Sequence, residues 1–260
     1  MKSKFLLFIC VVVLRSEFSL SQPAYSFSLS PELDIPLTAF SGISLGIGMY
    51  TNTRHDRHLL TEVQFESLNR IKVCGDTSAP LKADIVADKL SDGLLIGTIL
   101  TALETSLLIL PAAANDESMR GTNALMLIQI VALNQAATDL FKNYVHHARP
   151  FCYYRSQYPT FNDLRTEKGF GDVNRSFFSG HTSSTAAFSF LTADILASQA
   201  DTKFDKILIW SSGALMPAVV GYLRVKAKKH FPIDVVVGYI TGAVIGFGIA
   251  EIHKPEFLHF

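Results

Sequence analysis

The residues of this chain that are best suited to chemistry fall in three separated fragments. They are KNYVHHARP (142–150), SGH (179–181) and RVKAKKHFPID (224–234). Between them the fragments supply guanidinium and ammonium cations, histidines and a carboxylate. Arginine grips phosphate oxygens with two parallel hydrogen bonds and lysine adds a compact positive charge, while a histidine can attack or protonate the reacting group. The three fragments therefore predict a site for phosphoryl transfer.

The first fragment places Lys142 and Arg149 two helical turns apart. A helix that Pro150 ends would project both cations from one face, together with His146. This arrangement is typical of a cationic clamp. The alternative is a pair of basic anchors at the end of a membrane helix, where long side chains reach from apolar surroundings to water.

The second fragment marks the beginning of a helix. Ser179 stands shortly before the apolar run 185–196, so it is a natural N-cap, and the backbone N–H groups that follow it can bind an anion. Gly180 allows the backbone to approach a phosphate closely, and His181 could protonate a leaving alkoxide as a general acid. The alternative is a capped helix with a surface histidine.

The third fragment combines a histidine with a carboxylate across the beginning of another helix. Pro232 fits the first turn of that helix, Asp234 lies just inside the turn and His230 precedes it. At this spacing the carboxylate can accept a hydrogen bond from one ring nitrogen and leave the other free to attack phosphorus. Taken alone, the fragment also fits a basic loop next to a membrane.

In this order and at these intervals, the fragments resemble the signature of the type 2 phosphatidic acid phosphatase superfamily, which also includes bacterial nonspecific acid phosphatases and vanadium haloperoxidases. The family pattern reads K-x6-R-P, then P-S-G-H, then S-R-x5-H-x3-D. The chain departs from it where Phe178 replaces the proline and where Leu223 replaces the serine. The resemblance spans residues 83–255, looks closest to membrane-bound bacterial lipid phosphatases and is weak upstream.

The resemblance implies a role for each of these residues. His230 would become a phosphohistidine, Asp234 would hold its ring and His181 would protonate the leaving group. The phosphoryl oxygens would be bound by Lys142, Arg149, Arg224, Ser179 and Gly180. Neither a metal nor another cofactor is needed for this chemistry, although a haloperoxidase would hold vanadate in the same cage.

The resemblance also implies the substrate class, which is a lipid phosphate or an isoprenoid pyrophosphate of the phosphatidate, phosphatidylglycerol phosphate or undecaprenyl pyrophosphate type. Three alternatives stay open: a soluble periplasmic nonspecific acid phosphatase, a vanadium-dependent haloperoxidase and a non-catalytic lipid-phosphate binder. The net charge is zero and the basic residues are scattered among loops, which indicates no nucleic-acid partner. The expected partners are the lipid bilayer and a membrane lipid phosphate, and no pattern specifies an oligomer.

Six apolar stretches must position the three fragments. They are residues 35–50, 94–114, 123–145, 182–200, 207–223 and 234–252. Most approach the ~20 residues that a helix needs to cross a bilayer, which predicts an all-α, six-helix membrane-embedded bundle. Residues 83–90 alternate charged and apolar side chains at helical spacing, so we expect an amphipathic helix along the interface.

Polar catalytic groups are costly at the centre of a bilayer, and the active site is therefore expected at one membrane face. The composition, with 48% hydrophobic and 18% charged residues, is intermediate and keeps a soluble helical protein open.

The chain divides into three predicted parts. Residues 1–21 have a basic start, an apolar run and small residues near the end, as in a secretory signal peptide or an uncleaved signal anchor. Residues 22–92 would hold the first apolar helix, a polar loop and the interfacial helix, and residues 83–255 would form the phosphatase core. The expected location is a bacterial-type inner membrane with several crossings or, for the soluble alternative, the periplasm.

Two observations conflict on the side of the membrane that bears the site. A cleaved signal and six crossings would place the site in the cytoplasm, in agreement with the many Lys and Arg residues of 51–92. The membrane-bound relatives are understood to work on the outer, periplasmic face. A disulfide between Cys74 and Cys152 would require an oxidising compartment, and two free buried thiols are the alternative.

Overall fold

The computed structural model describes residues 27–54, 59–68, 84–167 and 170–255. The long helices are α2 (Pro31–Arg54), α4 (Ile85–Glu104), α6 (Ser118–Tyr144), α8 (Gly180–Gln199), α9 (Lys203–Lys226) and α10 (Pro232–Ile252). The short elements are α3 (Glu62–Ser67), the π-helix η2 (Thr105–Ile109), α5 (Leu110–Ala114), the 3-10 helices η3 (Pro150–Tyr153) and η4 (Phe170–Asp172), and α7 (Phe161–Arg165). The predicted all-α fold is confirmed, and the signal prediction for residues 1–21 lies outside the described ranges.

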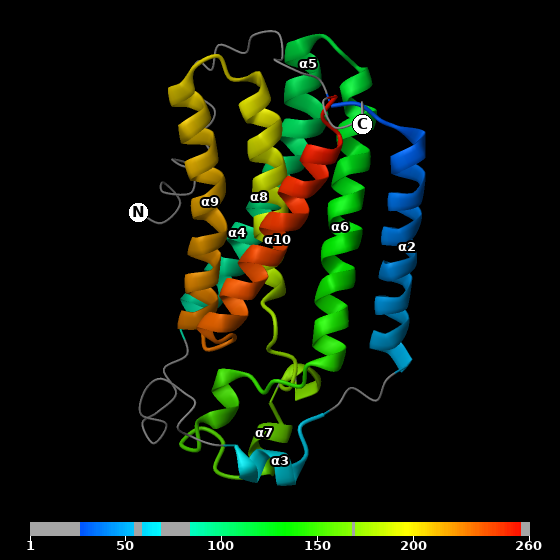
Figure 1. The fold of residues 1–260 in the computed structure, drawn as a ribbon. Coiled ribbons are helices and arrows are strands. Elements are labelled where there is room, and N and C mark those ends of the chain that lie inside the picture. Colours follow the sequence, from blue (N-terminus) through cyan, green and yellow to red (C-terminus); the bar gives the residue numbers. More distant parts are fainter. Residues whose placement is uncertain (1–26, 55–58, 69–83, 168–169, 256–260) are drawn as a thin grey trace.

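The long helices lie side by side and alternate in direction along the chain (Figure 1). As a result, the C-terminal ends of α2, α6 and α9 meet the N-terminal ends of α4, α8 and α10 at one end of the bundle. The small helices α3 and α7 lie at this same end. Each of the three sequence fragments begins or ends one of these long helices, so the topology alone brings the fragments together.

Within the described residues, four helical segments are long and apolar enough to cross a membrane, as expected of a membrane protein. They are Ile85–Ala114, Ser118–Tyr144, Lys203–Lys226 and Pro232–Ile252. Helices α2 and α8 do not belong to this group, although α8 runs the length of the bundle (Figure 1). Most residues of α8 are buried against α4, α6, α9 and α10. A helix that its neighbours shield from lipid can carry the small and hydroxyl side chains seen in α8.

The interfacial helix predicted for residues 83–90 is wrong as a separate element. Residues 85–90 are the first turns of α4, which continues without a break to Glu104. The two aspartates of this segment pair with basic residues of α9. Asp84 pairs with Lys226 at 2.9 Å, and Asp88 pairs with Arg224 at 2.7 Å. The helical periodicity was a correct signal, but it reports packing against the end of α9 and not a membrane surface.

Helix α10 crosses α8 in direct backbone contact through a stripe of glycines. A Cβ atom built on Gly242 would lie 2.0 Å from the Ser183 carbonyl oxygen, and Gly238 and Gly246 approach α8 almost as closely. Small residues allow this kind of approach between membrane helices. The contact fixes the first turn of α10 against the beginning of α8, where the Ser179 N–H donates to the Asp234 carbonyl oxygen at 3.0 Å.

We expect Gly242→Ala to lower the free energy of unfolding by about 2–3 kcal/mol, because the added methyl group overpacks the α8–α10 contact. The matched control is Gly248→Ala, since nothing lies within 4 Å of a Cβ at that position of the same helix. The control should be neutral or more stable by up to about 1 kcal/mol, as alanine favours helix over glycine. Thermal unfolding in detergent measures both effects, and equal midpoints for the two variants would contradict the packing argument.

Candidate active site

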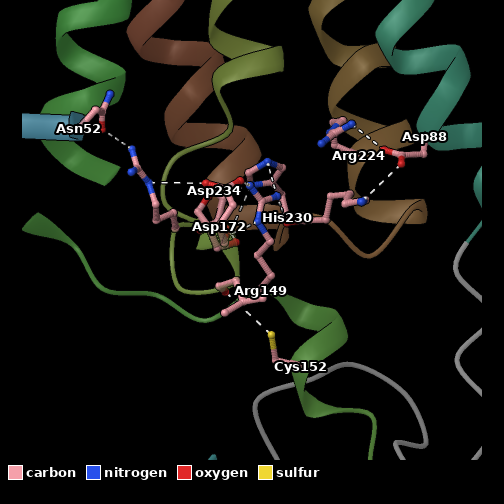
Figure 2. Close-up of polar contacts among 12 residues, drawn as sticks. Asn52, Asp88, Arg149, Cys152, Asp172, Arg224, His230 and Asp234 are labelled. Atoms are coloured by element: carbon pink, nitrogen blue, oxygen red, sulfur yellow. Dashed lines mark hydrogen bonds and ion pairs between the residues drawn. The ribbon is translucent and has the colours of Figure 1, made fainter. Parts of the chain in front are cut away.

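The three fragments converge at the end of the bundle where α4, α8 and α10 begin (Figure 1). Figure 2 shows Arg149 of the first fragment beside Arg224, His230 and Asp234 of the third. Lys142 lies in the last turn of α6, Arg224 in the last turn of α9 and Asp234 in the first turn of α10. His230 lies in the loop between α9 and α10, and its Nε2 atom is 3.4 Å from Nη1 of Arg149. Residues that are far apart in the sequence are therefore neighbours in space, as predicted.

The imidazole of His230 is buried and held by two fixed neighbours. Its Nδ1 atom lies 2.7 Å from the Ser176 carbonyl oxygen, and its Nε2 atom faces the Arg149 guanidinium. A carbonyl oxygen can only accept a hydrogen bond and a guanidinium can only donate one, so the proton is on Nδ1 and the lone pair is on Nε2. This tautomer leaves Nε2 as a nucleophilic atom.

The electrostatic surroundings of His230 favour the neutral ring. Burial is the main reason that the pKa of His230 is lowered to about 3; the cations Arg149, Arg224 and Lys142 also lower this pKa, and Asp234 opposes them. A protonated ring has no lone pair with which to attack phosphorus. The site therefore keeps His230 in the form required of a nucleophile across the physiological pH range.

Asp234 does not hold His230 directly, as the spacing had suggested. Its Oδ2 atom is 3.8 Å from the Nδ1 of His230, which is too long for a hydrogen bond. The carboxylate instead accepts hydrogen bonds from Ser176 Oγ at 2.5 Å and from the Phe231 backbone N–H at 2.9 Å. The hydrogen bond from Phe231 caps the N-terminus of α10, so the cap competes with His230 for the carboxylate. Ser176 thus links the two residues, because its carbonyl accepts from His230 and its hydroxyl donates to Asp234.

Arg149 reaches the site from an extended segment, and the prediction that it shares a helix face with Lys142 and His146 is wrong. Helix α6 ends at Tyr144, and the Arg149 backbone N–H donates to the Val173 carbonyl oxygen at 2.8 Å. Pro150 disfavours helical conformation in the residue before it, and Arg149 is accordingly extended. Backbone hydrogen bonds between this segment and residues 173–176, and not a helix face, place Arg149 at the site.

The Arg149 side chain is almost fully buried and is fixed on three sides. Nε donates to the Asp172 carbonyl oxygen at 3.0 Å, Nη1 donates to the Lys229 carbonyl oxygen at 3.0 Å, and Nη2 pairs with the Asp172 carboxylate. Beneath it, the Cys152 thiol is free and buried, and burial raises its pKa to about 12. This agrees with the free-thiol alternative for Cys152, while Cys74 lies outside the described residues.

Arg224 is held by acidic residues of α4. Its Nη1 atom lies 2.7 Å from the Asp88 carboxylate and 3.3 Å from Asp92 and from the Ser91 hydroxyl. Its buried Nε–H has no hydrogen-bond partner within the described ranges. A buried donor without a partner is costly, so this N–H is available to an incoming oxyanion.

The beginning of α8 matches its prediction. The Ser179 hydroxyl accepts from the Thr182 backbone N–H, which makes it the N-cap, and the site lies at the positive end of the helix dipole. A Cβ on Gly180 would lie 3.2 Å from Thr138 Cγ2 and 3.6 Å from Lys142 Nζ, so glycine keeps this space open. His181 is one-third exposed, and its Nε2 atom lies 2.8 Å from Oδ1 of Asp92.

Comparison with known proteins identifies a family for this chain. The model of the PAP2 superfamily matches residues 123–257, which contain every residue of the three fragments. The chain belongs to the PAP2 superfamily. A protein of Porphyromonas gingivalis named lipid A 4'-phosphatase is 26% identical over 129 residues, and the match covers 49% of each chain. The chain thus spans about half the length of this curated relative, and no solved structure matches.

At the two positions where the chain departs from the PAP2 signature, the side chains are apolar and pack against neighbouring elements. Phe178 is fully buried, and its ring centroid is 5.5 Å from that of Phe141 at the end of α6. Leu223 is buried with Ala87 and Ala227, where α4 meets the end of α9. Both side chains face neighbouring elements, and neither replaces a charged or nucleophilic group of the site.

Several polar residues of the site were missed by the sequence analysis. Asp88 and Asp92 precede the part of the chain that the PAP2 model matches, and their spacing of one helical turn on α4 was a visible signal. Asp172 and Ser176 lie in an irregular loop, which offers no periodic signal. His147 was also missed; its ring stacks on Phe231 with the centroids 4.9 Å apart, and its Nδ1 atom is 3.3 Å from Asp234.

Proposed function

We propose that this protein is a phosphatase that hydrolyses a lipid phosphate or an isoprenoid pyrophosphate through a phosphohistidine on His230, without a metal ion. The observation that carries the proposal is the tautomer of His230. Its Nε2 lone pair faces Arg149, and Lys142 and Arg224 are close enough for their charges to act on the ring. A neutral imidazole surrounded by cations suits attack on an anionic phosphate ester.

The proposed reaction has two steps. In the first, Nε2 of His230 forms a bond to phosphorus while the bond from phosphorus to the leaving oxygen breaks, and His181 gives that oxygen a proton. In the second, His181 takes a proton from water, the hydroxide attacks phosphorus, and the electrons of the P–N bond return to Nε2. The cations Lys142, Arg149 and Arg224 neutralise the equatorial oxygens in both steps.

The position of the site supports a lipid substrate. The catalytic fragments gather at the ends of the apolar helices, where the phosphate of a membrane lipid lies, and the Porphyromonas gingivalis relative is named for a phosphate on lipid A. We further propose that all six long helices cross the membrane. Residues 28 and 253, joined by a backbone hydrogen bond of 3.0 Å, would then share the face opposite the site (Figure 1).

The test is a substrate panel on one purified sample in detergent, with a chelator in excess. The panel contains phosphatidate, phosphatidylglycerol phosphate, undecaprenyl pyrophosphate, lipid A with its 4'-phosphate and a soluble aryl phosphate. We expect phosphate release from at least one of the lipids despite the chelator. Activity on the aryl phosphate alone would favour a soluble-type acid phosphatase, and halide oxidation that depends on added vanadate would identify a haloperoxidase. Saturable binding with no phosphate release would indicate a non-catalytic binder.

A further inference from the structure

Three aspartates, Asp84, Asp88 and Asp92, form a stripe along one side of the beginning of α4 at intervals of four residues, and Asp84 is the N-cap of that helix. Asp84 is 2.9 Å from Lys226 Nζ, and Asp88 is 2.7 Å from Arg224 Nη1. Asp92 is the last of the three and differs from the others. Its Oδ1 atom lies 2.8 Å from His181 Nε2 and 3.3 Å from Arg224 Nη1, so one carboxylate oxygen joins the histidine to the arginine.

The other charges around His181 disfavour its protonated form. The ring lies in the first turn of α8, next to the positive end of the helix dipole. Arg224 of α9 and Lys142 of α6 both act on it with positive charge, whereas the negative charge comes from Asp92 of α4. A general acid must carry a proton before it can donate one. Without Asp92, His181 would therefore be a poor acid for a leaving group that needs protonation.

We infer that Asp92 is a positioning residue for His181. This inference rests on the proposed function, in which His181 protonates the leaving oxygen. Asp92 accepts the Nε2–H of the imidazolium, fixes the ring orientation and stabilises its positive charge, which leaves the Nδ1–H for donation to the leaving oxygen as the P–O bond breaks. The carboxylate stays ionised throughout, and the proton that reaches the leaving group comes from His181 alone.

A different role for Asp92 would be to hold Arg224 and α4 in place. The two roles predict different dependence on the leaving group, because only a residue that supports the general acid matters more when the leaving oxygen is basic. Asp88 supplies the matched control, since it also binds Arg224 through the same Nη1 atom and has no hydrogen bond to His181. Asp84 is a second control from the same stripe; it pairs with Lys226 and caps α4 by accepting a hydrogen bond from the Ala87 N–H.

The experiment compares Asp92→Asn, Asp88→Asn, Asp84→Asn and His181→Ala on two aryl phosphates that carry the same alkyl chain. One releases a phenol and the other a dinitrophenol, which needs no protonation. We expect Asp92→Asn to reduce kcat/KM for the phenol ester by about 10²-fold and for the dinitrophenol ester by less than about 3-fold. Asp88→Asn should reduce both equally, and Asp84→Asn should resemble the unaltered protein.

Three further readouts separate a positioning role from a structural one. The double variant His181→Ala with Asp92→Asn should be no slower on the phenol ester than His181→Ala. Asp92 acts through His181, so its loss has no further effect once the general acid is gone. The alkaline limb of the phenol-ester pH profile should move to lower pH in Asp92→Asn, since the imidazolium loses its counter-charge. Asp92→Glu should restore part of the activity on the phenol ester.

The outcomes distinguish failure of this inference from failure of the proposed function. If Asp92→Asn slows both esters equally while His181→Ala remains selective for the phenol ester, the inference is wrong and the function stands. If His181→Ala also slows both esters equally, the assignment of the general acid fails, and Asp92 loses its proposed role with it. Absence of a phosphoenzyme on either ester would overturn the proposed function itself.

Discussion

Replacement of His230 by alanine is expected to abolish turnover, with kcat reduced at least about 10⁴-fold, as is usual when a covalent nucleophile is removed. The variant keeps Arg149, Arg224 and Lys142, so it should still bind phosphate and phosphate esters. It cannot form a P–N bond, because no other ring nitrogen of the described residues lies in the place of Nε2 beside Arg149. Rapid-quench labelling with a radioactive substrate should show an acid-labile, base-stable phosphoenzyme in the unaltered protein and none in the variant.

The control for His230→Ala is His146→Ala. His146 is exposed and lies in the segment between α6 and Arg149, so its loss should leave labelling and turnover within about 2-fold of the unaltered protein. Thermal unfolding in detergent should show that the His230 variant is folded. A folded His230→Ala protein that still accumulates phosphohistidine would refute the assignment of the nucleophile.

Convergence of the fragments was predictable from the sequence because each fragment carries its own helix boundary. Pro232 and Asp234 mark the beginning of α10 and Ser179 caps α8, and alternating helices must bring such boundaries to one end of a bundle. The charges and residue types of the fragments then indicate what this end of the bundle can bind. These signals are local, so they need no knowledge of how the helices pack.

The contacts within the site were not predictable in the same way. A spacing of four residues between His230 and Asp234 fits a direct hydrogen bond, but Ser176 lies between them and takes the Nδ1–H on its carbonyl. Ser176 comes from a different loop, and nothing in its neighbouring sequence relates it to α10. Arg149 illustrates the same limit, because its position follows from pairing with residues 173–176 and not from the periodicity of α6.

Segments of mixed charge at helical spacing were ambiguous for a physical reason. The pattern of residues 85–92 satisfies a membrane interface and a protein interface equally well, since both offer apolar surface beside charge. The last turn of α9 decides between them, because it supplies Arg224 and Lys226 to the acidic face. The basic residues of α9 and the aspartates of α4 are far apart in the sequence, so only the fold reveals that they pair.

Arg149→Lys is expected to reduce kcat/KM by about 10²–10³-fold, and Arg149→Ala by about 10⁴-fold, within the range known for arginines that stabilise transferring phosphoryl groups. A matched control is Arg175→Lys. Arg175 contacts the same Asp172 carboxylate at 3.5 Å and donates to Asn52, and no hydrogen bond joins it to His230 in the described structure. Its replacement should change kcat/KM by less than about 5-fold.

The reason for the large effect of Arg149→Lys is geometric, because the positive charge is preserved. The guanidinium uses Nε, Nη1 and Nη2 to bind Asp172 and the Lys229 carbonyl at once, and this fixed fork directs one N–H toward Nε2 of His230. When phosphorus approaches Nε2, the same N–H can donate its hydrogen bond to an equatorial phosphoryl oxygen instead. Lysine has a single nitrogen and cannot hold the loop and the oxyanion together. If Arg149→Lys retained nearly full kcat/KM, a point charge would be sufficient at this position, and the fork would serve only to hold the segment against Asp172.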